Sequence, residues 1–168
     1  MIITHTNLEI IKKKIFVRET LSRQLNIWRM KSQKIVFTNG CFDLLHHGHI
    51  DYLSKAADLG DVLVIGLNSD ASVKKLNKGA NRPIQIENDR ALILSAIQFV
   101  EAILIFEEDT PYELIKLVQP DVLVKGGDWK ESDIVGADIV KKKGGLVTTI
   151  PYVEGYSTTN IEKRIKNW

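Results

Sequence analysis

The amino-acid sequence predicts an α/β protein with a doubly wound, five-stranded parallel sheet and a helical N-terminal extension. Two observations support this fold class. After residue 33, short apolar runs alternate with segments of helical periodicity, which is the pattern of successive β–α–β units. The runs are uniformly apolar instead of alternating with polar residues, which is typical of strands covered by helices on both faces. We therefore divide the chain into an extension (1–33) and a main domain (34–168).

Five runs rich in Val, Ile and Leu are the expected strands, and they cover residues 34–38, 62–67, 102–106, 121–125 and 146–150. The segments between them have helical spacing and predict helices over 50–60, 87–99, from 110 onward, over 132–143, and from about 157 to the C-terminus. In the third of these helices, Thr110 is the expected cap, Pro111 suits the first helical position, and Glu113 completes a capping box.

The first 33 residues have a different pattern from the main domain. The segment "TNLE" at Thr6 is a capping box, and Leu21, Leu25 and Trp28 lie on one helical face. We expect these helices to pack on the sheet or on a second subunit. In the second case the protein would be a homodimer. We interpret Trp28 and Trp168 as packing residues and not as ligand contacts.

The composition limits the classes of partner. The chain has 168 residues, of which 44% are hydrophobic and 26% charged, and its net charge of +2 is too small to indicate a nucleic-acid or membrane partner. No apolar run approaches the roughly 20 residues that span a bilayer, and the N-terminus does not have the pattern of a signal peptide. Because Cys41 is the single cysteine, an internal disulfide is excluded. We expect a cytoplasmic protein.

Three polar loops follow predicted strands and are expected to meet at one edge of the sheet. They are "NGCFDLLHHGH" (39–49), "GGDW" (126–129) and "YVEGYSTT" (152–159). In open α/β sheets, ligands bind beyond the carboxyl ends of the strands, where the strand order reverses. These loops are therefore the predicted ligand site.

The first loop contains an H-x-G-H segment at the start of a predicted helix. His46, His47 and His49 are three of the four histidines of the chain. His46 and His49 share a face of the first helical turn, where unpaired backbone N–H groups already favour an anion. Gly48 lets a phosphate approach the backbone. The loop has neither a dinucleotide fingerprint nor a P-loop sequence, so it predicts a different kind of phosphate site.

A metal site is the alternative interpretation of two histidines at this spacing. The sequence has no H-E-x-x-H segment, and Asp43 is the single further ligand that the loop suggests. We therefore predict no protein-bound metal site.

The motifs also resemble a known family. "TNGCFDLLHHGHIDYL" and "EGYSTTNIEKRI" are similar to the H-x-G-H and Ser/Thr-rich motifs of the cytidylyltransferase-like nucleotidyltransferases. Within that family, "NSDASVKKL", "RPI", "FEEDTPYELI", "PDVLVKGGDW" and "VEGYSTT" resemble, in order and spacing, the D-glycero-beta-D-manno-heptose 1-phosphate adenylyltransferases, the nucleotidyltransferase domain of ADP-heptose synthase. The resemblance covers about residues 34–165 and implies a Rossmann-like fold for a nucleotidyltransferase domain at 34–168.

The resemblance implies transfer of AMP from ATP to a heptose 1-phosphate, with release of pyrophosphate and with Mg²⁺ accompanying ATP. The product would be an ADP-heptose for the lipopolysaccharide core or another surface glycan, and a separate sugar kinase would act in the same pathway. Two alternatives stay open: a glycerol 3-phosphate type of cytidylyltransferase that uses CTP, and a non-catalytic nucleotide-binding protein. Tyr152 and Gly127 stand where the glycerol 3-phosphate type has an arginine and an acidic residue, which favours the heptose type.

The resemblance and the motif positions together assign site residues. The expected catalytic residues are His46, His49, Arg90 and Lys78. Asp43 either orders its loop or acts through Mg²⁺, and we leave both roles open. The expected nucleotide-binding residues lie on the three loops and after the second predicted strand: Thr38, Asn39, Gly40, Phe42, Asp43, Gly48, Lys75, Gly126, Gly127, Asp128, Glu154, Ser157, Thr158 and Thr159.

Overall fold

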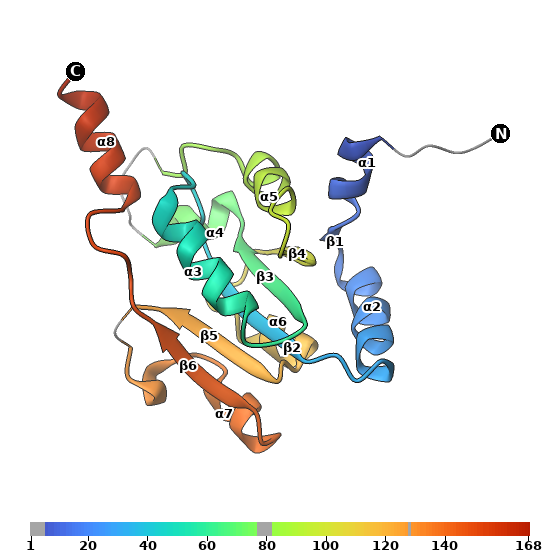
Figure 1. Ribbon diagram of the computed structural model, residues 1–168. Helices are drawn as coiled ribbons and strands as arrows, with labels where there is room; N and C mark the ends of the chain where they lie inside the picture. The colour runs from blue at the N-terminus through green and yellow to red at the C-terminus, as the bar shows by residue number, and fades with distance from the viewer. Residues whose placement is uncertain (1–5, 77–81, 128) are drawn as a thin grey trace.

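The computed structural model describes residues 6–76, 82–127 and 129–168 and has a parallel sheet flanked by helices (Figure 1). Neighbouring strands follow the order β1-β4-β3-β2-β5-β6, and all of their pairings are parallel. The strands are β1 (Ile15–Phe16), β2 (Ile35–Gly40), β3 (Val62–Asn68), β4 (Ala102–Phe106), β5 (Val122–Gly126) and β6 (Leu146–Ile150). The α/β Rossmann-like fold class is confirmed.

The strand order reverses direction at β2. From β2 the chain continues to β3 and β4 on one side, and it returns to β5 and β6 on the other. The β2–β3 ladder runs from Ile35 to Gly40, whereas the β2–β5 ladder pairs only Val36 with Val122 and Phe37 with Leu123. The two central strands therefore part toward their carboxyl ends, which is where such folds bind ligands.

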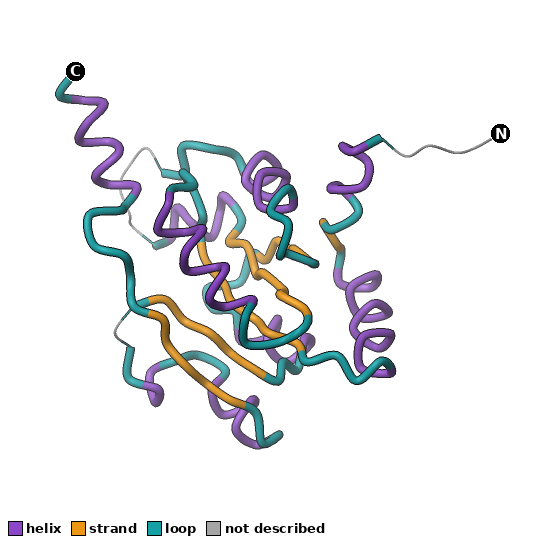
Figure 2. The backbone as a smooth tube through the Cα atoms, viewed as in Figure 1, coloured by secondary structure: helices purple, strands orange, loops and turns teal. Residues whose placement is uncertain are grey.

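The helices form a layer on each face of the sheet, as Figure 2 shows by colour. They are α1 (Asn7–Lys12), α2 (Arg18–Met30), α3 (His47–Ala57), α4 (Asp70–Lys75), α5 (Glu87–Ser95), α6 (Tyr112–Val118), α7 (Ala137–Lys142) and α8 (Thr158–Lys166), with a 3-10 turn, η1 (Glu131–Asp133). No helix among the residues that the structure describes is long and apolar enough to cross a membrane.

Two hydrophobic clusters account for the uniformly apolar strands. On β2, Ile35 and Phe37 belong to a cluster that α2, α6 and α7 cover, while Val36 belongs to a second cluster under α3 and α5. Successive side chains of a strand point to opposite faces, so a strand buried on both faces is apolar at every position.

The sheet has six strands where the sequence predicted five. The additional strand, β1, pairs Ile15 and Phe16 with Ile103 and Leu104 of β4. It is two residues long, so it has no periodicity that a sequence pattern could reveal. The N-terminal extension is therefore not wholly helical, and it packs on the sheet of its own chain.

The helix α2 confirms the expected packing face of the extension. Leu21, Leu25 and Trp28 are buried in the first cluster. The expectation for Trp168 is wrong, because this side chain is fully exposed at the end of the chain. The boundary between residues 33 and 34 stays a prediction.

Four predicted helices differ in their bounds from the sequence expectation. The helix expected over 50–60 is α3, which covers His47–Ala57. The helix at 87 ends at Ser95 and not at 99. The helix after β4 begins at Tyr112 with Pro111 as its cap, and no side chain caps it, so the expected role of Thr110 is wrong. The expected helix over 132–143 is divided into η1 and α7 by Gly136, whose φ of 83° lies in the left-handed region that interrupts a helix.

We predict that Leu21→Ala lowers the free energy of unfolding by about 2–5 kcal/mol, because it leaves a cavity at a fully buried position. Ile27→Ala on the same helix is the matched control, since Ile27 is 45% exposed and its loss should change stability by no more than about 0.5 kcal/mol. Urea denaturation measures both. Equal effects of the two changes would contradict packing of the extension on the sheet.

Candidate active site

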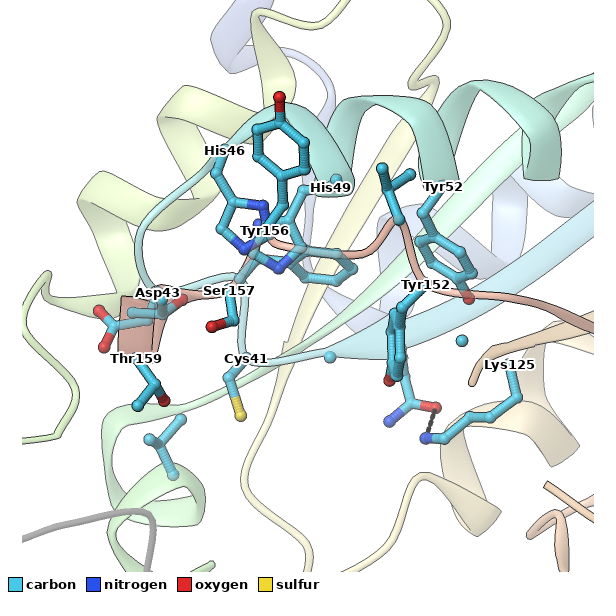
Figure 3. A pocket seen from close by; sticks show the side chains of 18 of the residues that line it. Cys41, Asp43, His46, His49, Tyr52, Lys125, Tyr152, Tyr156, Ser157 and Thr159 are labelled. Atoms are coloured by element: carbon cyan, nitrogen blue, oxygen red, sulfur yellow. Dashed lines mark hydrogen bonds between the residues drawn. The ribbon is translucent and has the colours of Figure 1, made fainter. Parts of the chain in front are cut away.

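A cavity of about 710 Å³ opens at the carboxyl ends of β2 and β5, where these strands part (Figure 3). Its walls come from the loop after β2, the first turn of α3, the end of β5, and the segment that leads into α8. Three predicted loops thus meet at one place. The predicted site residues that line the cavity are Asn39, Gly40, Phe42, Asp43, His46, Gly48, His49, Gly126, Ser157, Thr158 and Thr159.

His46 and His49 face one another at the start of α3. His46 is the N-cap of this helix, and the backbone N–H of His49 donates to the His46 carbonyl at 2.9 Å. Their rings stack with centroids 3.9 Å apart and planes inclined by 24°. Burial, and to a smaller degree the neighbouring His47, lowers the pKa of His46. His46 is therefore a neutral donor and acceptor near pH 7.

Gly48 lies at a point of close approach. A Cβ atom at this position would lie 3.2 Å from His46 Nδ1 and 3.2 Å from the Cβ of Tyr156. Contacts this short force neighbouring atoms to move. The glycine thus lets the first turn of α3 and the segment before α8 approach each other, and this closes one wall of the cavity.

Asp43 joins the loop after β2 to the segment before α5. Its carboxylate accepts from the backbone N–H groups of Ile84 and Gln85 at 2.9–3.0 Å and from Arg82 Nη1 at 2.8 Å. Burial raises the pKa of Asp43, but the hydrogen bonds from Gln85, Ile84 and Arg82 outweigh burial and hold this pKa below its ordinary value. The carboxylate is ionised and committed to these donors.

The same contacts show whether Asp43 could bind Mg²⁺. Both oxygens of Asp43 are occupied by N–H donors, and the described residues include no group of three or more His, Cys, Asp or Glu side chains that could hold a metal ion. Of the two roles left open for Asp43, the structure favours ordering of the loop. A Mg²⁺ ion would have to be held chiefly by triphosphate oxygens.

The N-terminus of α8 forms another wall. Ser157 caps the helix, since its Oγ accepts from the backbone N–H of Asn160 at 3.0 Å. Thr158 and Thr159 begin the first turn and line the cavity. Hydroxyl groups and unpaired helix N–H groups therefore face the same space as the histidines.

Arg90 does not line the cavity and lies beneath it. Its side chain is fully buried, and its guanidinium donates to the carbonyls of Gln85, Cys41 and Asn68 at 2.6–3.0 Å and pairs with Asp70 at 2.6 Å. These contacts hold the loops after β2 and β3 together. The expected direct contact of Arg90 with a substrate phosphate is therefore not what the structure supports.

Four other predicted site residues also lie outside the lining. Thr38 is buried, and its hydroxyl lies 2.6 Å from that of Tyr52. Lys75 is exposed and pairs with Asp109 at 2.7 Å. Glu154 is exposed, and Gly127 lies behind the ring of Tyr152. Lys78 and Asp128 lie outside the described residues.

Several lining residues were missed by the sequence reasoning. They are Cys41, Tyr52, Val73, Arg82, Lys125, Trp129, Tyr152, Val153 and Tyr156. Lys125 Nζ donates to Asn39 Oδ1 at 3.2 Å and lies 5.9 Å from the centre of the Trp129 ring. Lys125 lies near the carboxyl end of a predicted strand, and this position could have indicated that it lines the site. Val73 and Arg82 come from segments that the strand-end rule does not select.

Comparison with known proteins identifies the family. The family model described as cytidylyltransferase-like matches residues 37–164, which is more than half of the chain. The chain therefore belongs to the cytidylyltransferase-like family.

Several relatives at about 50% identity share one name. The bifunctional protein HldE of Wolinella succinogenes is 49% identical over 155 residues, which cover 92% of this chain and 32% of that protein. The protein of the same name from Campylobacter jejuni subsp. doylei is 54% identical over 156 residues, covering 93% of this chain and 32% of that protein. The chain thus spans about a third of the length of these curated relatives.

Solved structures also resemble the chain. A lipopolysaccharide core biosynthesis protein from Thermoplasma volcanium has a TM-score of 0.61 and 28% identity, and the likeness covers 74% of this chain and 99% of that one. A pantothenate synthetase from Thermus thermophilus has a TM-score of 0.52 and 17% identity, covering 84% of this chain and 68% of that one, so this likeness concerns the fold alone.

We predict that Asp43→Asn lowers the free energy of unfolding by about 2 kcal/mol at pH 7, because it removes the charge from several hydrogen bonds. The pKa of Asp43 is depressed by folding, so its contribution is complete above the ordinary value of 3.8 and is lost as pH falls through the folded pKa. In urea titrations from pH 7 to pH 3, the difference between the two proteins should therefore be constant near neutral pH and shrink as pH falls below 3.8. A constant difference across this range would contradict an ionised Asp43.

Proposed function

We propose that this chain is a nucleotidyltransferase that transfers AMP from ATP to a heptose 1-phosphate and releases pyrophosphate. The observation that carries the proposal is the meeting of His46 and His49 with the Thr158–Thr159 turn of α8 around one cavity. High identity to proteins named HldE, over most of this chain, supports the choice of reaction, as does the similarity of its motifs to heptose 1-phosphate adenylyltransferases. The proposed product is an ADP-heptose for lipopolysaccharide core or another surface glycan.

The proposed reaction needs positioning more than base catalysis. A phosphate oxygen of the sugar 1-phosphate attacks the α-phosphorus of ATP, the bond from that phosphorus to the β-phosphate bridging oxygen breaks, and pyrophosphate leaves. The attacking oxygen is already anionic, so no strong base is required. The protein must hold two anions in line and stabilise charge on the transferring group.

The proposed roles follow from position. His46 and His49 would donate N–H groups to oxygens of the transferring phosphate, and the N-termini of α3 and α8 would add backbone donors. Ser157, Thr158 and Thr159 would hold the β- and γ-phosphates. Mg²⁺ would accompany ATP as part of the substrate and would neutralise its phosphates.

Two further cationic residues keep proposed roles in the reaction. Arg90 would act as a positioning residue, because it fixes the carbonyls of the loop that bears the histidines. Lys78 stays a proposed phosphate ligand. The separate sugar kinase, a homodimer and a cytoplasmic location also stay predictions.

A panel of substrates tests the function. The full chain with Mg²⁺ is incubated with ATP or CTP and with heptose 1-phosphate or glycerol 3-phosphate, and pyrophosphate is measured. We expect release with ATP and heptose 1-phosphate, at least about tenfold faster than with any other pair. Release with CTP and glycerol 3-phosphate alone would replace the proposal by the cytidylyltransferase alternative. No release with any pair would favour a nucleotide-binding protein.

We predict that His46→Ala and His49→Ala each reduce kcat by on the order of a hundredfold, because each removes a donor to the transition state. His47→Ala is the matched control, since His47 does not line the cavity and instead contacts the ring of Tyr156. Its rate should change by less than about threefold. Steady-state pyrophosphate release measures the three rates. Near-normal turnover of His49→Ala would contradict the proposed roles.

A further inference from the structure

The helix α8 contributes to the cavity but is weakly anchored by packing. None of its side chains is buried, and in Figure 1 it projects from the edge of the domain. The polar contacts at its start are local: Ser157 caps the helix, and Asn160 Nδ2 donates to the Gly155 carbonyl at 3.0 Å. Local contacts of this kind shape the helix end but do not fix its direction relative to the sheet.

An ion pair supplies a long-range contact. Glu162 Oε1 lies 2.9 Å from Arg82 Nε, and the side chains of Arg82 and Glu162 are 11% and 28% exposed. Thr158 and Glu162 are four residues apart, so they share a face of α8. The face that presents Thr158 to the cavity therefore also presents Glu162 to Arg82, which itself lines the cavity.

Arg82 is fixed on its other side by Asp43. Arg82 Nη1 donates to Asp43 Oδ2 at 2.8 Å, and the Asp43 side chain is 5% exposed. Asp43 is in turn held by the backbone N–H groups of Ile84 and Gln85. A continuous chain of charged contacts thus runs from the histidine-bearing loop, through Arg82, to α8.

The geometry suits arginine in particular. A planar guanidinium offers separate edges to two carboxylates, whereas a lysine ammonium is a point charge on a flexible stem. Because the Arg82 side chain is mostly buried, its two ion pairs are screened by water less than surface pairs are. These two ion pairs therefore connect α8, which has no buried side chain, to the loop after β2.

We propose that Arg82 is a positioning residue that holds the N-terminus of α8 against the cavity by pairing with Glu162. This inference rests on the proposed function, because the groups that it positions, Thr158 and Thr159, are those assigned to the nucleotide phosphates. Loss of the Arg82–Glu162 pair loosens α8 and weakens nucleotide binding, while the core of the sheet stays intact.

The test compares Glu162→Gln, Arg82→Gln and the double variant with the wild-type chain. Glutamine keeps the size and helix propensity of glutamate, so the pair is lost without a direct cost to the helix. Lys163→Gln, on the adjacent position of α8, is the control for a change of charge. Hydrogen exchange of α8 and β3 is measured without nucleotide, and ATP and CTP dissociation constants are measured without acceptor.

In Glu162→Gln we expect exchange of α8 to accelerate about tenfold with β3 unchanged, and the dissociation constant of the nucleotide that binds wild type to rise about tenfold. Arg82→Gln should do at least as much, because it also removes the pair with Asp43. The double variant should bind no more weakly than Arg82→Gln, because Arg82→Gln has already removed the pair with Glu162. Lys163→Gln should resemble wild type.

Three results would overturn the inference: wild-type exchange and affinity in Glu162→Gln, additive effects in the double variant, or an equal effect of Lys163→Gln. A general rise of exchange that includes β3 would also contradict it, because that pattern indicates loss of the fold and not of helix position. The exchange measurement uses neither nucleotide nor acceptor, so its result is independent of whether the chain transfers AMP.

Discussion

The cavity depends on the hydrogen bonds of the Tyr52 hydroxyl. This hydroxyl bridges polar groups of β2 and β5 at the point where the two strands separate. It lies 2.6 Å from the hydroxyl of Thr38 on β2 and donates to the carbonyl of Val124 on β5 at 3.3 Å. Thr38 must then be the donor to Tyr52. Burial raises the pKa of Tyr52, so this hydroxyl keeps its proton. One residue further on, Lys125 and Asn39 are joined through their side chains. Polar groups of the parting strands are thus paired, as buried groups must be.

In the proposed phosphate site, both arginines have compensating partners. Arg90 is paired with Asp70 and with carbonyls, and Arg82 is paired with two carboxylates. The depressed pKa of His46 leaves its imidazole neutral near pH 7. Under the proposed function, phosphate would be held by fixed N–H and hydroxyl dipoles, which need no reorganisation when an anion arrives, together with the Lys125 ammonium on the cavity wall. Arginines in this site act mainly by fixing the loops that carry these dipoles.

The parts of the structure that follow from local pattern could be predicted from the sequence. The five longer strands are mostly apolar, and the convergence of the loops that bear His46 and Ser157 follows from parallel topology alone. The short strand β1 could not be found, because two residues have no period. Arg90 was expected at the phosphate site but is buried: an arginine in a helix is usually exposed, and here the pair with Asp70 and the carbonyls of distant loops make its burial favourable.

The difference between local patterns and contacts of distant residues also explains why the sequence predicted a role for His46 but not for Arg82. The histidines belong to a short motif whose helix start fixes their relative position, so spacing is informative. Arg82 meets Asp43 and Glu162 across 39 and 80 positions of sequence, and no periodicity links such residues. A site assembled from three separate loops needs contacts of this kind, because backbone ladders end where the loops begin. The residues that hold such a site together are therefore the ones that a single sequence reveals least.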